Sequence, residues 1–140
     1  MAAFKSVLLV DDSRATNFMH RELIRESDFA ERVDVALDGE AALEYLRSGG
    51  DSEYFPPSVI FLDINMPKMD GFEFLEACKA LPGVQEGSLV IVMLTTSLDP
   101  GDRIRALATG MVRDFHNKPL SREALEEMKR LVAERATVPA

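Results

Sequence analysis

Residues 59–63 read Val-Ile-Phe-Leu-Asp, four consecutive apolar residues that run directly into an aspartate. A continuous apolar run without alternation is typical of a strand buried on both faces, and such strands form parallel sheets covered by helices. The strand predicted at Val59–Leu62 is one of five. The other runs lie at Val7–Val10, Val33–Leu37, Leu89–Leu94 and Val112–Phe115.

Segments with helical spacing separate these runs. The spacing i, i+3, i+4, i+7 of one apolar helix face is seen, for example, in Ile104, Leu107, Ala108 and Met111. Capping residues mark helix starts: Asp70 stands three residues before Glu73, and Asp99 precedes Pro100. Strand and helix thus alternate five times. This predicts an α/β fold, a (βα)5 doubly wound five-stranded parallel sheet with the flavodoxin-like strand order 2-1-3-4-5.

Composition excludes several classes of protein. A chain of 140 residues corresponds to one domain, and a hydrophobic content of 46% excludes wholesale disorder. The single cysteine, Cys78, excludes an intramolecular disulfide and a cysteine-rich zinc site. The net charge of −8 argues against a nucleic-acid-binding protein, which usually carries a basic surface. No apolar stretch approaches the roughly 20 residues of a membrane helix, and no signal peptide is visible, so we expect a cytoplasmic protein.

Acidic residues follow two of the predicted strands. Asp11 and Asp12 come directly after the first strand, and Asp63 ends the third. In the order 2-1-3-4-5 these strands are neighbours, so the three carboxylates should converge where ligands bind in such sheets. Either residue of the Asp11-Asp12 pair alone could cap the next helix. Three close carboxylates repel one another unless a cation lies between them, and Mg²⁺ prefers oxygen ligands.

The remaining strand ends supply a hydroxyl and an ammonium group. Thr95 follows the fourth strand, and Lys118 follows the fifth. A metal ion, an ammonium and a hydroxyl together suit a phosphoryl group, whose transfer depends on positioning and charge neutralisation. A carboxylate can itself be the nucleophile. Asp63 is the best candidate because it lies in the middle of the predicted site, whereas Asp11 and Asp12 are better placed to hold metal.

These motifs together resemble the receiver domain of a two-component response regulator. The resemblance is carried by Val-Leu-Leu-Val-Asp-Asp at 7–12, Ile-Phe-Leu-Asp-Ile-Asn-Met-Pro-Lys-Met-Asp-Gly at 60–71, Val-Met-Leu-Thr-Thr-Ser at 92–97 and Asn-Lys-Pro at 117–119. It covers about residues 5–133, so we expect a single receiver domain over 1–140 and no effector domain.

The resemblance implies a role for each matching residue. Asp63 would accept a phosphoryl group from the phosphohistidine of a sensor histidine kinase. Asp12, Asp63 and the backbone carbonyl of Asn65 would bind Mg²⁺, and Asp11 would hold a metal-bound water. Lys118 would pair with the phosphoryl group.

Three further positions carry the family's switch and loop features. Thr95 would turn its hydroxyl toward the phosphoryl group, and Phe115 stands where the family keeps its switch aromatic. The peptide bond before Pro119 is expected to be cis. The phosphorylated state would be read by a protein partner on the face formed by the fourth helix, the fifth strand and the fifth helix. Self-association through that face stays open.

The resemblance also bears on partners. Leu-Thr-Thr-Ser at 94–97 and Tyr-Phe-Pro-Pro at 54–57 are most similar to stand-alone regulators paired with phytochrome-like sensor kinases. Onward transfer to a histidine phosphotransfer protein is the alternative output. A phosphatase with an aspartate nucleophile is less favoured, because such enzymes usually carry Asp-x-Asp after the first strand. We therefore expect a phosphoacceptor and not an enzyme. His20 and His116 are interpreted as surface or strand-side residues, not ligands.

Overall fold

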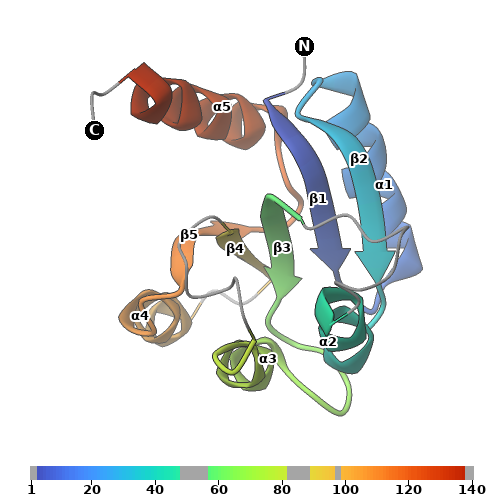
Figure 1. Cartoon of the computed structure of the whole chain (residues 1–140). Coiled ribbons are helices and arrows are strands. Elements are labelled where there is room, and N and C mark those ends of the chain that lie inside the picture. The colour runs from blue at the N-terminus through green and yellow to red at the C-terminus, as the bar shows by residue number, and fades with distance from the viewer. Residues whose placement is uncertain (1–2, 48–56, 82–88, 97–98, 138–140) are drawn as a thin grey trace.

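Five parallel strands form one sheet in the order β2-β1-β3-β4-β5, which confirms the predicted topology (Figure 1). The strands of the computed structural model are β1 (Phe4–Val10), β2 (Ala30–Ala36), β3 (Val59–Asp63), β4 (Val90–Thr95) and β5 (Val112–Asn117). The helices between and after them are α1 (Arg14–Glu26), α2 (Gly39–Arg47), α3 (Gly71–Cys78), α4 (Pro100–Ala108) and α5 (Arg122–Thr137).

The structure describes residues 3–47, 57–81, 89–96 and 99–137, and for 131–137 only the backbone. Residues 54–56 and Ser97, which contributed to the resemblance, lie outside these ranges. Within the described ranges, no helix is long and apolar enough to cross a membrane.

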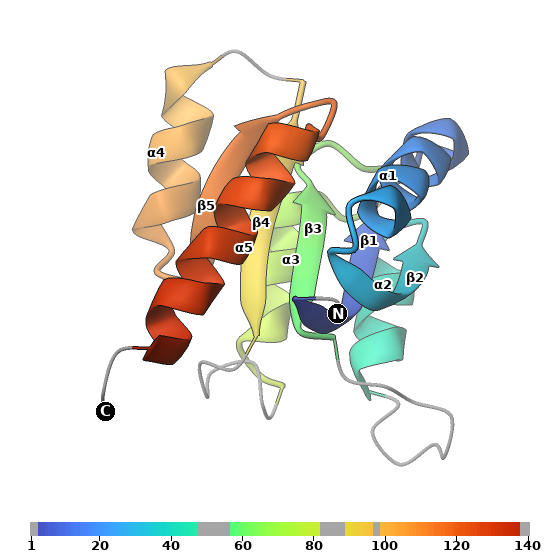
Figure 2. The same ribbon diagram turned by 90° about the horizontal axis from the view of Figure 1, so that it is seen from above.

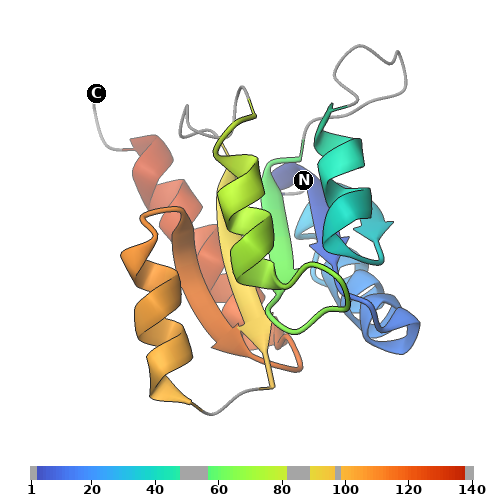
Figure 3. The same cartoon turned by 90° about the horizontal axis from the view of Figure 1, so that it is seen from below.

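Helices cover both faces of the sheet, so each strand is buried on two sides. Helices α1 and α5 lie over one face (Figure 2), and α2, α3 and α4 lie over the other (Figure 3). Alternate residues of β1 belong to the two apolar layers: Val7 and Leu9 pack with α1 and α5, whereas Leu8 and Val10 pack with α2, α3 and α4. Burial on both faces explains the continuous apolar runs.

The ends of the first two strands along the chain differ from the prediction. Strand β1 begins at Phe4 and β2 at Ala30, because the two pair in parallel from Phe4 opposite Ala30 to Val10 opposite Ala36. Leu37 lies beyond β2. Since β2 is an edge strand, Glu31 and Arg32 at its start are exposed and polar, and its apolar run marks only part of the strand.

The helix caps follow the predicted pattern, with one difference. The Asp70 carboxylate accepts a hydrogen bond from the Glu73 N–H at 2.8 Å, and the Glu73 carboxylate accepts one from the Asp70 N–H at 3.1 Å. Asp99 caps α4. Helix α1 is capped by Ser13, so neither member of the Asp11-Asp12 pair serves as its cap.

Candidate functional site

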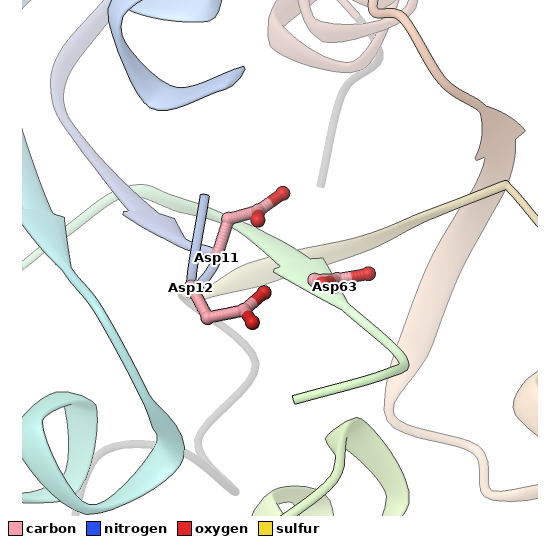
Figure 4. A group of neighbouring side chains, drawn as sticks. All are labelled: Asp11, Asp12 and Asp63. Carbon is pink, nitrogen blue, oxygen red and sulfur yellow. The ribbon is translucent and has the colours of Figure 1, made fainter. Parts of the chain in front are cut away.

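Three carboxylates converge where β1 and β3 end. Asp11 and Asp12 follow β1, and Asp63 is the last residue of β3 (Figure 4). The register that pairs Val10 with Leu62 brings these strand ends side by side. One carboxylate oxygen from each aspartate lies within 4.8 Å of the others. The structure thus brings together the three acidic residues that the sequence placed at one site.

The three aspartates differ in burial. Asp11 and Asp63 are 4% and 5% exposed, whereas Asp12 is exposed. Burial raises the pKa of Asp63, and the charge of Asp11 raises it further, while Lys118 and the backbone N–H of Asn65 act in the opposite direction. Burial and the neighbouring carboxylate therefore disfavour the ionised form of Asp63, and nearby positive charge favours it.

The ammonium of Lys118 lies between two of the carboxylates. Its Nζ is 2.6 Å from Oδ2 of Asp11 and 3.1 Å from Oδ1 of Asp63. Burial alone would lower the pKa of Lys118, but hydrogen bonds to Asp11 and Asp63 and the charges of both raise it above its ordinary value. Lys118 is therefore a fixed positive charge at the strand ends.

Backbone contacts hold the chain that carries Lys118. Its N–H donates to the carbonyl of Thr95 at 2.8 Å, and its peptide bond with Pro119 is cis. The next N–H, that of Leu120, donates to Nε2 of His20 at 3.1 Å. The turn after β5 is thus fixed both to β4 and to helix α1.

The interpretation of His20 as a surface or strand-side residue was wrong. His20 is 2% exposed, because α1 turns the face that carries Asn17, His20 and Ile24 toward the sheet. The i, i+3, i+7 spacing of these three residues was the available signal. His116 does lie on a strand, β5, where its Nε2 is 2.9 Å from Oδ2 of Asp114.

Asn17 is a second residue that sequence reasoning missed. Its Nδ2 donates to the backbone carbonyl of Asp11 at 2.9 Å, in the buried interior. The carboxylate of the same aspartate accepts the N–H of Ser13 at 2.9 Å. Helix α1 therefore fixes both the backbone and the side chain of Asp11.

A glycine borders the nucleophile candidate. A Cβ at Gly71 would lie 2.6 Å from the carbonyl oxygen of Asp63, closer than real Cβ atoms approach a backbone oxygen. The Gly71 N–H also donates to the carbonyl of Ile64 at 2.7 Å. Absence of a side chain at this position lets α3 begin directly under the end of β3.

The remaining predicted site residues surround this cluster at different depths. Thr95 ends β4 and is fully buried, while Asn65 lies two residues after Asp63 and is exposed. Phe115 is 7% exposed on β5, where it pairs with Met93 of β4 and packs in the layer beneath α4. The aromatic ring is thus inside the protein in this structure.

The donor set fits a divalent cation. The three neighbouring carboxylates and the ammonium of Lys118 carry a formal charge of −3 + 1 = −2. All the candidate ligand atoms are oxygens, which Mg²⁺ prefers, and the exposed Asp12 leaves one side of the cluster open to solvent.

Comparison with known proteins agrees with this geometry. The sequence profile of the response regulator receiver domain matches residues 7–130. The chain is 37% identical to the response regulator Rcp1 of Synechocystis sp. over 101 residues, which span 71% of this chain and 67% of Rcp1.

Solved structures of similar proteins share the fold. A two-component response regulator from Cytophaga hutchinsonii has a TM-score of 0.83 at 32% identity, covering 93% of this chain and 97% of that chain. The Mn²⁺-bound form of Rcp1 has a TM-score of 0.70 at 30% identity, with coverage of 97% and 99%. The bacteriophytochrome response regulator AtBRR has a TM-score of 0.74 at 28% identity, with coverage of 98% and 96%.

Proposed function

The chain belongs to the response regulator receiver domain family, and on that premise we propose that Asp63 accepts a phosphoryl group from the phosphohistidine of a sensor histidine kinase. The observation that carries the proposal is the Lys118 ammonium 3.1 Å from the Asp63 carboxylate, within a cluster of three acidic residues. An ordinary ion pair on the surface requires neither buried side chains nor three converging carboxylates.

The proposed transfer forms one bond and breaks one. An Asp63 carboxylate oxygen attacks phosphorus while the bond from phosphorus to the histidine nitrogen breaks, and the electron pair of that bond leaves on the imidazole. The product is an aspartyl phosphate. Lys118 can neutralise charge on the phosphoryl oxygens from its present place beside Asp63. Its raised pKa keeps it charged during the transfer.

Magnesium is the metal we propose for the acidic cluster. Asp12, Asp63 and the backbone carbonyl of Asn65 would hold it directly, and Asp11 would hold it through water. When bound, the ion supplies positive charge to the phosphoryl oxygens. Since Asp11 already binds Lys118 and the Ser13 N–H, a water-mediated role agrees with its contacts.

We propose that phosphorylation is read on the face of α4, β5 and α5. Thr95 ends the strand next to β3 and directly follows Leu94, which pairs with Asp63, so it stands at the strand ends where a phosphoryl group on Asp63 would add charge. Movement of Thr95 would change the space available to Phe115 on the adjacent strand. Two apolar side chains of α4, Ile104 and Leu107, are 69% and 44% exposed and could contact a protein partner or a second copy.

The proposed donor and recipient of the phosphoryl group are identified by class. Receiver domains of response regulators, including those of bacteriophytochromes, work with sensor histidine kinases, and similarity to AtBRR supports a phytochrome-like kinase as the donor. Such a partner would place this protein in the cytoplasm. The phosphoryl group would end as a signal to a partner protein or pass to a histidine phosphotransfer protein, without enzymatic turnover of another substrate.

Phosphorylation by a small donor tests the proposal without knowledge of the kinase. With acetyl phosphate and Mg²⁺, the intact mass of the wild type should rise by one phosphoryl group, and Asp63→Asn should show no rise. Asp28→Asn is the matched control, because Asp28 is exposed and its φ of 55° suits asparagine. Equal labelling of the wild type and Asp63→Asn would refute the proposal.

A further inference from the structure

His20 is a buried polar side chain for which the proposed chemistry has no use. It lies on α1, is 2% exposed, and its Nε2 accepts a hydrogen bond from the N–H of Leu120 at 3.1 Å. The two residues are 100 positions apart in the chain. A buried imidazole with a backbone partner at such separation fixes one segment against another.

The segment that His20 holds is the one that carries Lys118. Asn117 ends β5, Lys118 and Pro119 follow, and Leu120 is the next residue with an N–H. The turn is fixed on its β5 side by the bond from the Lys118 N–H to the Thr95 carbonyl, at 2.8 Å. His20 fixes its other side. Lys118 therefore extends from a turn that is held at both ends.

Helix α1 is a suitable anchor because it is fixed to the same site. Asn17, one turn before His20 on the same buried face, donates to the carbonyl of Asp11 at 2.9 Å. The Asp11 carboxylate in turn binds the Lys118 ammonium at 2.6 Å. Asn17 and His20 thus connect α1 to the acidic end of β1 and to the basic turn after β5. A single helix face thus contacts both elements.

The bond to Leu120 requires the neutral form of the ring. Nε2 can accept only while it carries a lone pair, so the proton of the neutral imidazole is on Nδ1. Burial lowers the pKa of His20, the charge of Asp11 raises it and that of Lys118 lowers it, with a net decrease. Burial thus favours the form that holds the turn.

We propose that His20 is a positioning residue that sets the place of the Lys118 ammonium for phosphoryl transfer to Asp63. The proposal rests on the proposed function. It assigns His20 no contact with the reacting atoms: its effect runs through the Leu120 N–H and the backbone of the turn. A displaced Lys118 would keep its charge but lose its alignment with the phosphoryl group.

Two substitutions of His20 distinguish the effect of its hydrogen-bond acceptor from the effect of its volume. His20→Leu fills similar space without an acceptor, and His20→Gln offers its side-chain oxygen in place of Nε2. Ile24→Val is the control for loss of packing on the same buried face of α1, because it shortens an apolar side chain without removing a hydrogen-bonding atom. Hydrogen exchange of the Leu120 amide shows whether the bond exists. The rate of labelling by acetyl phosphate, per folded protein, shows its effect on transfer.

The proposal expects the Leu120 amide to be protected in the wild type and in His20→Gln, and to exchange faster in His20→Leu. Labelling should slow roughly 10- to 100-fold in His20→Leu, recover to within about threefold of the wild type in His20→Gln, and stay at the wild-type rate in Ile24→Val. In a Lys118→Met background, His20→Leu should cause no further decrease.

Four outcomes would overturn it. An unchanged labelling rate in His20→Leu would show that the bond does not position Lys118. Equal decreases in the leucine and glutamine variants, or a further decrease in the Lys118→Met background, would show an effect that does not run through the acceptor and Lys118. Absence of labelling in the wild type would refute the proposed function itself and this proposal with it, so the two failures are distinguishable.

Discussion

The Nζ of Lys118 lies 3.1 Å from Oδ1 of Asp63. The two residues follow β5 and end β3, which are not neighbours, since β4 lies between them. Their contact therefore needs three strands with aligned carboxyl ends and a turn that brings Lys118 back across β4. The charge pair at the site is a product of the whole sheet and not of one loop.

Removal of the ammonium should slow phosphorylation while leaving the fold intact. Lys118→Met is expected to decrease the rate of labelling by acetyl phosphate about 100-fold, because the variant loses a positioned positive charge beside the attacking carboxylate. Lys79→Met, which removes a surface ammonium paired with Glu76 at the C-terminal end of α3, should label at the wild-type rate. Similar rates in both variants would contradict the role of Lys118.

Magnesium should stabilise the wild type through the acidic cluster. At about 100 times its dissociation constant, a ligand that binds only the folded state adds about 2.7 kcal/mol to the free energy of unfolding. Asp12→Ala should lose most of this increase, since the exposed carboxylate is the one most open to a metal ion. Thermal unfolding with Mg²⁺ or EDTA measures it, and Glu40→Gln, at an exposed carboxylate of α2, is the control. If Mg²⁺ stabilises Asp12→Ala as much as it stabilises the wild type, Asp12 is excluded as a ligand.

A tryptophan probe should report the proposed switch. The chain contains no tryptophan, so Phe115→Trp places a single emitter on β5 next to the layer beneath α4. Its emission should change when acetyl phosphate and Mg²⁺ are added and should stay constant when the same variant also carries Asp63→Asn. Phe18→Trp, at a side chain that is 66% exposed on α1, should not respond. A constant signal from Phe115→Trp in fully labelled protein would disprove the switch role.

Protonation of His20 should decrease the stability of the protein at acidic pH. Its pKa in the folded protein lies below the ordinary 6.5, owing to burial first, with Asp11 and Lys118 as the facing charges. Between the two pKa values the unfolded chain binds more protons, so the free energy of unfolding falls as the pH drops below about 6.5, by at most about 1.4 kcal/mol per pH unit from this group.

Urea unfolding between pH 7.5 and 5 measures this effect. His20→Gln should remove the fall in the free energy of unfolding that His20 causes at acidic pH. His116→Gln, which leaves His20 in place, should retain that fall. If the free energy of unfolding depends on pH equally in the wild type and in His20→Gln, burial of His20 does not depress its protonation.

Most of the fold could be predicted because its signals are local. Burial on both faces gives continuous apolar runs, and helix starts such as Asp70 and Asp99 carry their own capping chemistry. Strand β2 was placed less well because an edge strand needs no apolar side chains on its exposed parts. Ser13 as the cap of α1 was missed, because two aspartates precede it and each is also a good capping residue.

The charged residues of the site were predictable and their supports were not. Asp11, Asp63 and Lys118 stand at strand ends, where the topology brings them together. His20 and Asn17 bind backbone groups, the Leu120 N–H and the Asp11 carbonyl. Every residue offers a backbone carbonyl, and every residue except proline offers an N–H, so no residue type marks the partner in the sequence. Only the path of the chain shows where these contacts form.

Chemical trapping of the phosphorylated residue tests the central claim most directly. Borohydride reduces an aspartyl phosphate to homoserine, which tandem mass spectrometry locates in a proteolytic peptide. Protein treated with acetyl phosphate and Mg²⁺ should contain homoserine at position 63 and unmodified aspartate at Asp11 and Asp12. Homoserine at Asp11 or Asp12, or none in protein that carries a phosphoryl group, would contradict the assignment of Asp63 as the phosphoacceptor.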